Sequence, residues 1–339
     1  MTAFVEADMN NWNYWKKQTG DCPLANDFEI TRINTDIINT EACNMNPIYN
    51  IEFINEKVNL WNDDHHRSYC RQHTFELINK FTETHTYSNL INTDMLINEA
   101  NMYAIVKKRL ISLHSIPFAD DWGINELIDY FNITDILQNE TILVLCSYNN
   151  TFYVYTSYGE GWITINPECD LQFIKKDQWI DLYKRTSPNT VLCENHMLEV
   201  AFSHLKQRYL WGSAYDCSGY IRCVFNELGL NIPSNTTRQK AMPCIKYDVS
   251  DSSIDEKKRI LNILPVGSVL YMPGHAALYI GQRNDHYYVI NSVGSYYDPH
   301  TRYLYKPRLV MINSLDLIRA SGETWLESMN MFIIPWLHE

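Results

Sequence analysis

The feature that most constrains this chain is the stretch YLWGSAYDCSGYIRCVFNELGLNIP, residues 209–233. Apolar residues recur at helical spacing directly after Cys217, and Gly229 supplies a stop. The spacing predicts a helix over residues 217–228 with a cysteine in its first turn. A fold that contains this helix has to bury its apolar stripe and still place the cysteine at an end.

A cysteine in the first helical turn has a chemical advantage. A helix N-terminus concentrates unpaired N–H groups and partial positive charge, so we expect the pKa of the Cys217 thiol to lie below its ordinary value. Asp216 is a good N-cap residue, and Ser218 and Gly219 keep the first turn small enough for a substrate to approach. The pattern therefore favours a nucleophilic role for Cys217 over the role of a small buried side chain in the core.

A nucleophilic thiol needs a base. His275 in MPGHAALYIG opens a predicted apolar strand, which would fix its imidazole as a general acid and base; a buried core histidine is the alternative. Asn291 in YYVINSVG lies on the next predicted strand and would orient the imidazole if the strands form a hairpin. His286, in the turn RNDH, is the second candidate for that position. The chain order Cys217, His275, Asn291 is that of papain-like peptidases.

Together these motifs resemble the signature of the NlpC family of papain-like cell-wall cysteine peptidases. The first block of that signature reads Tyr-x-Trp-Gly, then Asp-Cys-Ser-Gly, then a helix followed by Gly, Pro and Gln. In this sequence it corresponds to Tyr209, Trp211, Gly212, Asp216, Cys217, Ser218, Gly219, Gly229, Pro233 and Gln239. The later blocks fall on Gly267, His275, Tyr279, Gly281 and Asn291, where many members have histidine at the last position. The loop SAYD departs from the family, because it is short and lacks the usual second glycine after Trp-Gly.

The resemblance implies a cysteine endopeptidase that hydrolyses the γ-D-glutamyl–L-diamino-acid bond of peptidoglycan stem peptides, in particular stems with a free N-terminal L-Ala. His275 would draw the proton from Cys217, and Asn291 would orient the ring while a thioester forms and is hydrolysed. The backbone N–H of Cys217 would help hold the oxyanion. This mechanism needs no metal and no organic cofactor.

The same resemblance implies residues that would bind the substrate. Asp216 would help bind the L-Ala ammonium, with Ser218 and Trp211 beside it. Tyr158 in TSYGEGWI is the expected contact from the preceding domain. Weaker candidates for that contact are Asp120 and Asp121.

The rest of the chain predicts an α+β protein with two units ahead of the peptidase domain. Residues 1–102 contain helix-like stretches and predict a mostly helical N-terminal unit. Residues 103–176 contain short β-prone runs and resemble a bacterial SH3-like β-barrel that ends on the strand GWI; a packing module without a ligand is the alternative. Residues 195–339 would form the papain-like domain, and the tail RLVMINSLDLIRASGETWLESM, residues 308–329, resembles the end of such multi-domain members.

Charge and composition narrow the partners. A formal net charge of −12 argues against binding to nucleic acid or to anionic membranes as the main function. No apolar run has the roughly 20 residues that a membrane span requires. Nine cysteines without CxxC pairs exclude a complete disulfide framework and a zinc ribbon. The cluster DDHHRSYCRQH, residues 63–73, has metal-like spacing, although a solvated helix end explains it as well. The sequence carries no signal for an oligomeric state.

The first residues, MTAFVEADMNNWNYW, do not read as a signal peptide. We therefore expect a cytoplasmic protein if the chain is complete, and a periplasmic or secreted one if a leader has been removed. Two other functions stay open at this point. One is an NlpC-like amidase or acyltransferase that acts on another amide or ester, and the other is a non-catalytic peptidoglycan-binding module. The complete set Cys217, His275 and Asn291 favours catalysis.

Overall fold

A computed structural model describes residues 7–16, 23–38, 103–114, 132–148, 150–156, 159–175, 177–178, 182 and 192–337. The chain divides into two compact units, Met1–Cys43 together with Lys184–Glu339, and Asn44–Tyr183. The first 43 residues thus group with the C-terminal segment and not with residues 44–102, with which we expected them. The further helices expected between residues 39 and 102 lie outside the described residues, so a helical N-terminal unit stays a prediction.

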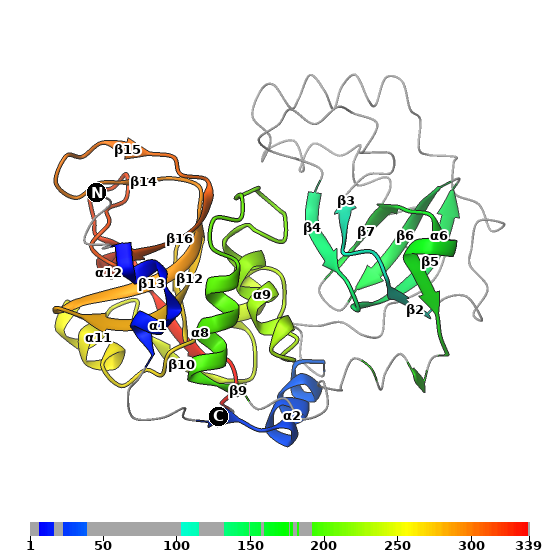
Figure 1. The fold of residues 1–339 in the computed structure, drawn as a ribbon, viewed down its shortest axis with the longest axis horizontal. Helices are drawn as coiled ribbons and strands as arrows, with labels where there is room; N and C mark the ends of the chain where they lie inside the picture. The colour runs from blue at the N-terminus through cyan, green and yellow to red at the C-terminus, as the bar shows by residue number, and fades with distance from the viewer. Residues whose placement is uncertain are drawn as a thin grey trace. The chain divides into compact units, whose positions relative to one another are not determined.

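A six-stranded antiparallel sheet forms the centre of the first unit (Figure 1). Its strands, in spatial order, are β10 (Ile245–Asp248), β17 (Met331–Ile334), β11 (Val269–Met272), β12 (His275–Arg283), β13 (His286–Val293) and β16 (Leu309–Ser314). The expected strands GSVLYM, HAALYIG and YYVINSV are confirmed as β11, β12 and β13. Along β11 every residue is buried, and along β13 only the first is not, because other elements cover both faces of the sheet.

The predicted helix is confirmed as α9, Cys217–Glu227, and it packs against β12 and β13. Its apolar stripe is fully buried, and each large side chain of this kind contributes about 1.5–3 kcal/mol to folding. Gly229 follows with a φ of 80°, a left-handed conformation that favours glycine and ends the helix. The other helices in the described part of residues 184–339 are α8 (Glu194–Ser203), α10 (Thr236–Lys240), α11 (Ile254–Leu261) and α12 (Trp325–Ser328).

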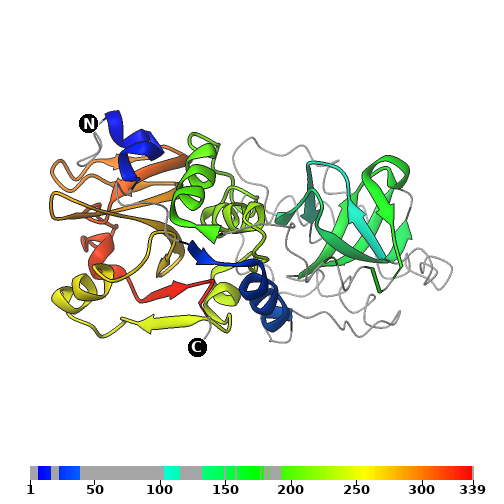
Figure 2. The ribbon, with the colours of Figure 1, turned by 60° about the horizontal axis from the view of Figure 1, so that its bottom comes forward.

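Figures 1 and 2 show α8 and α9 together at one side of the sheet and α11 at the other. The N-terminal segment completes this unit with a 3₁₀ turn at Ala7–Asn10, α1 (Trp12–Trp15), β1 (Pro23–Ala25) and α2 (Asp27–Ile38).

Contacts with residues far away in the sequence hold the N-terminal segment in place. Strand β1 pairs with β9, Leu192–Cys193, and α1 lies against α8. The buried Asn34 side chain donates to the carbonyl of Gly229 at 2.9 Å and accepts from the N–H of Asn231 at 2.8 Å. Helix α2 is therefore bonded to the turn that ends α9. A two-stranded ribbon of β14 (Tyr296–Tyr297) and β15 (Leu304–Tyr305) follows β13.

A seven-stranded antiparallel sheet forms the second unit, and the predicted β-prone runs are confirmed as its strands. In spatial order they are β4 (Asn132–Leu137), β3 (Leu110–His114), β7 (Gly159–Thr164), β6 (Thr151–Thr156), β5 (Thr141–Tyr148), β2 (Tyr103–Val106) and β8 (Leu171–Phe173), with the short helix α6 (Pro167–Asp170) before β8. Within the described residues β4 and β8 are edges and do not pair, so the expected closed barrel is not seen. A cluster of buried apolar side chains forms the hydrophobic core of this unit.

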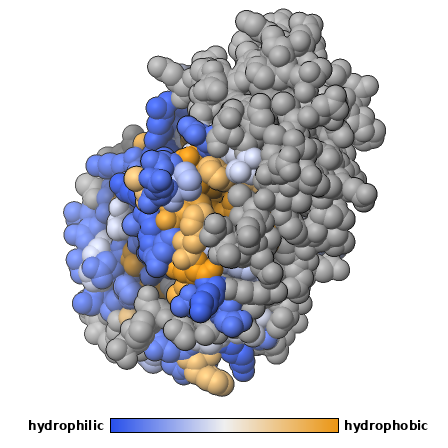
Figure 3. Space-filling view, turned by 90° about the vertical axis from the view of Figure 1, so that its right-hand side faces the viewer, coloured by the Kyte–Doolittle hydropathy of each residue, from blue (hydrophilic) through white to orange (hydrophobic). Residues whose placement is uncertain are grey.

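One surface of the described residues carries a band of hydrophobic side chains bordered by hydrophilic ones (Figure 3). Within the described part of the chain, no helix combines the length and the apolar character that crossing a bilayer requires.

Candidate active site

Cys217 lies at the start of α9, where the capping of the helix fixes its place. The Asp216 side chain accepts from the N–H of Gly219 at 2.7 Å and from the Ser218 hydroxyl at 3.1 Å, so it is the N-cap that the sequence predicted. A Cβ on Gly219 would lie 2.3 Å from the backbone oxygen of Ser213. This glycine is required because the preceding loop passes so close to the first turn of the helix.

His275 and Asn291 meet across the hairpin of β12 and β13, as the sequence predicted. His275 Nε2 lies 2.8 Å from Asn291 Oδ1. The Cys217 sulfur lies against the backbone N–H of Ala276, the residue that follows His275. The structure therefore brings all three predicted residues to one end of the hairpin. His286, the other candidate, opens β13 instead and places Nδ1 2.7 Å from Asp316 Oδ2.

The protonation of the site differs from the expectation. Burial raises the pKa of the Cys217 thiol to about 12, and the Asp216 carboxylate beside it acts in the same direction. The N–H groups at the helix start lower that pKa, but their effect is smaller than the cost of desolvating a thiolate. The prediction of a lowered thiol pKa was therefore wrong for this structure.

The histidine shifts in the complementary direction. Burial lowers the pKa of His275 to about 4, the hydrogen bond to Asn291 opposes this shift, and the positive charge of Arg319 adds to it. On these values the Cys217 thiol and the His275 imidazole are both neutral at neutral pH. In this state the imidazole can act as a general base that takes the proton as the sulfur attacks.

The predicted substrate-binding residues have different surroundings. Ser218 is buried, and Trp211 is exposed over 58% of its surface. Burial raises the pKa of Asp216, whereas the N–H groups of Gly219 and Gly212 and the Ser218 hydroxyl lower it. Tyr158, together with Asp120 and Asp121, lies outside the described residues.

Three residues that sequence reasoning did not assign to the site also lie at it. Burial raises the pKa of Tyr209, and the negative charges of Cys217 and Asp216 act in the same direction. The Trp325 ring lies edge-on to His275 with 5.0 Å between the ring centroids. Arg319 donates from Nη2 to the carbonyl of Pro273 at 2.8 Å, two residues before His275. The signature position of Tyr209 was a usable signal, and the tail that holds Trp325 and Arg319 was matched to the family only as a whole, without a role for either residue.

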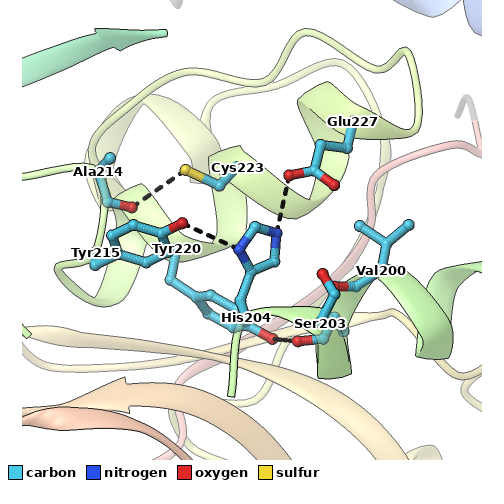
Figure 4. Close-up of polar contacts among 9 residues, drawn as sticks. Val200, Ser203, His204, Ala214, Tyr215, Tyr220, Cys223 and Glu227 are labelled. Carbon is cyan, nitrogen blue, oxygen red and sulfur yellow. Dashed lines mark hydrogen bonds and ion pairs between the residues drawn. The ribbon is translucent and has the colours of Figure 1, made fainter. Parts of the chain in front are cut away.

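A second polar cluster fixes the loop in front of Cys217 (Figure 4). His204, just after α8, lies between the Tyr215 hydroxyl, 3.2 Å from Nδ1, and the Glu227 carboxylate, 3.1 Å from Nε2. On β13, the Ser292 hydroxyl donates to the Tyr215 carbonyl at 2.5 Å. Tyr215, two residues before Cys217, is thereby linked to β13 through Ser292 and to the C-terminal end of α9 through His204 and Glu227.

Among the described residues no group of three or more His, Cys, Asp or Glu side chains could hold a metal ion. The cluster at residues 63–73 lies outside them.

The chain is also similar to known proteins. A model of the NlpC/P60 family matches residues 206–310. The chain is similar to the structure of an NlpC/P60 endopeptidase from Photobacterium damselae subsp. piscicida, with a TM-score of 0.65 and 12% identity, covering 96% of this chain and 97% of that chain. At that identity the likeness concerns the fold.

A second solved structure is less similar. An NlpC/P60 family protein from Bacillus cereus is 16% identical over 69% of this chain and 63% of that chain, but its TM-score of 0.31 is too low to carry an argument. No curated protein matches the sequence.

Proposed function

Since residues 206–310 are a domain of the NlpC/P60 family, whose members are cysteine peptidases, we propose that the protein cuts peptidoglycan stem peptides between γ-D-glutamate and the L-diamino acid. The observation that carries this proposal is the 2.8 Å contact between His275 and Asn291 beside the buried thiol of Cys217. A binding module has no use for an oriented imidazole next to a nucleophile.

The proposed reaction starts from the neutral pair. The Cys217 sulfur attacks the amide carbon while its proton moves to His275, and the carbonyl oxygen gains the negative charge. The N–H groups at the start of α9 would hold that charge. The imidazolium then protonates the leaving nitrogen, the carbon–nitrogen bond breaks, and a thioester with the γ-carbonyl remains.

Hydrolysis completes the cycle. A water molecule gives one proton to His275 and its oxygen attacks the thioester carbon. The sulfur leaves and regains a proton from the imidazolium, so that the thiol and the neutral imidazole are restored. Cys217 and His275 thus exchange one proton in each half-reaction, and the products are L-Ala-D-Glu and the free diamino acid.

The substrate contacts belong to the same proposal. The Asp216 carboxylate would attract the ammonium of L-Ala, Ser218 would line the same pocket, and the exposed ring of Trp211 would cover the stem peptide. Residues 103–176 would act as an SH3-like domain. The antiparallel sheet of the second unit supports this reading.

The test is digestion of the synthetic tripeptide L-Ala-γ-D-Glu-diamino acid, followed by mass spectrometry of the products. We expect L-Ala-D-Glu and the free diamino acid, and slower release when the L-Ala amine is acetylated. An intact γ-D-glutamyl bond after long incubation, with cleavage of another amide or an ester in the same preparation, would overturn the assignment of the bond.

A further inference from the structure

Asn291 is itself oriented by a second buried amide. Its Nδ2 donates to Asn313 Oδ1 at 2.7 Å and to the carbonyl of Met311 at 3.5 Å. Asn313 lies on β16, next to β13, and its own Nδ2 donates to the carbonyl of Ser314 at 2.9 Å. Both asparagines are buried, with exposed fractions of 0% and 1%, so water does not compete for these bonds.

The direction of these hydrogen bonds is fixed by the acceptor at the end of the series, the carbonyl of Ser314. The backbone oxygen of Ser314 only accepts, so the Asn313 side chain must turn its NH₂ group toward it. The Asn313 oxygen is then left to accept from Asn291, so Asn291 must donate to it from its own NH₂ group. The Asn291 oxygen therefore faces His275 Nε2, and that nitrogen must carry the hydrogen.

This order determines which nitrogen of the imidazole is the base. A neutral imidazole carries one hydrogen, so a hydrogen on Nε2 leaves Nδ1 with a free electron pair. We propose that Asn313 is a positioning residue that, through Asn291, holds His275 as the Nε2–H tautomer with Nδ1 as the base for Cys217. In the reaction Asn313 contacts neither the substrate nor the sulfur.

Only the expected effect of Asn313 on catalysis rests on the proposed function. Asn313→Leu removes both the acceptor for Asn291 and the donor to Ser314, so that the NH₂ group of Asn291 keeps only the long contact to Met311. Asn291 can then rotate and present its NH₂ group to the ring, which favours the other tautomer. We expect kcat to fall about tenfold or more, with KM changed less than about twofold.

Two variants separate positioning from a structural role. Asn313→Asp, when protonated, can donate to Ser314 and accept from Asn291 as asparagine does, and burial keeps a carboxyl protonated at pH 5.5. We expect this variant to retain the wild-type tautomer at that pH. Asn34→Leu removes another fully buried asparagine with two hydrogen bonds in the same unit, and should lower stability without changing the tautomer.

The readout is ¹⁵N–¹H correlation of ¹⁵N-histidine-labelled full-length protein, with the His275 signals assigned by their loss in His275→Gln. The Nε2–H tautomer in the wild type, Asn313→Asp and Asn34→Leu, and its loss in Asn313→Leu, are the expected result. An unchanged tautomer in Asn313→Leu, or the same change in Asn34→Leu, would overturn the inference. If Asn313→Leu does not fold, a wild-type or Asn313→Asp protein with the hydrogen on Nδ1 overturns it equally. Because this spectrum needs no substrate, its failure is distinguishable from a failure to cut the tripeptide.

Discussion

The Gln239 side chain, on α10, donates to the carbonyl of Ser218 at 3.0 Å and thereby links α10 to the first turn of α9. The same NH₂ group donates to the carbonyl of Pro233 at 2.8 Å, while its oxygen accepts from the Tyr271 hydroxyl at 3.2 Å. All of these groups are buried around a glutamine with no exposed surface. The glutamine of the sequence signature is therefore explained by the support that it gives to the helix that carries Cys217.

This relationship predicts the effect of Gln239→Ala. Three hydrogen-bonding groups lose a buried partner, so we expect the free energy of unfolding to fall by about 2–4 kcal/mol. Chemical denaturation measures the change, with Gln207→Ala at an exposed position as the control, for which we expect less than about 0.5 kcal/mol. Equal stabilities of the two variants would contradict the role given to Gln239.

Gly219→Ala tests the close approach of the loop to α9. The added Cβ would meet the backbone oxygen of Ser213 at 2.3 Å, and backbone atoms on both sides cannot give way cheaply. We expect a loss of at least about 2 kcal/mol of stability together with lower activity, because the turn that holds Cys217 must shift. Gly159→Ala is the matched control, since no atom lies within 4 Å of its added Cβ. Thermal unfolding that moves equally in both variants would show that the contact is unimportant.

The pKa values predict how Cys217 reacts with pH. The thiol pKa of about 12 and the imidazole pKa of about 4 mean that a neutral pair is the main species between these limits. Alkylation of Cys217 by iodoacetamide should therefore rise steadily with pH above 7, without a plateau at neutral pH. Rates are measured by mass spectrometry of the peptide that contains Cys217, with the exposed Cys169 as internal reference. A plateau between pH 5 and 8 would indicate a thiolate–imidazolium pair and would contradict this account.

The lowered pKa of His275 also predicts a dependence of stability on pH. In the unfolded chain the imidazole binds a proton below its ordinary pKa of 6.5, while the folded protein resists protonation down to about 4. Stability should thus be lost as the pH falls from 6.5 to 4, by about 3 kcal/mol from this residue. The free energy of unfolding of His275→Gln, measured by chemical denaturation at pH 6.5 and pH 4, should lack this part of the decline. Parallel curves for the variant and the wild type would show that His275 titrates normally in the folded state.

The parts of the site that the sequence predicted are those set by local patterns. Cys217 was identified by its place before an apolar helical stripe, and His275 and Asn291 by their places on two consecutive strands that form a hairpin. Each of these signals lies within a few residues of the side chain concerned. The strands of the second unit were recognised in the same way, from short β-prone runs between turns.

The parts that were missed depend on contacts between distant segments. The pKa of Cys217 is set by how deeply the packed domain buries it, which no local pattern records. Asn313 reaches Asn291 only because β16 pairs with β13, and Trp325 reaches His275 from the tail. The grouping of the N-terminal segment with the C-terminal unit likewise rests on the pairing of β1 with β9.

We propose that the sulfur of Cys217 breaks the substrate bond. The test is turnover of L-Ala-γ-D-Glu-diamino acid by Cys217→Ala, compared with Cys169→Ser and the wild type. We predict that Cys217→Ala, folded as judged by its unfolding temperature, releases no diamino acid above background, while Cys169→Ser retains the wild-type rate. Release of the diamino acid by Cys217→Ala at the wild-type rate would contradict the claim.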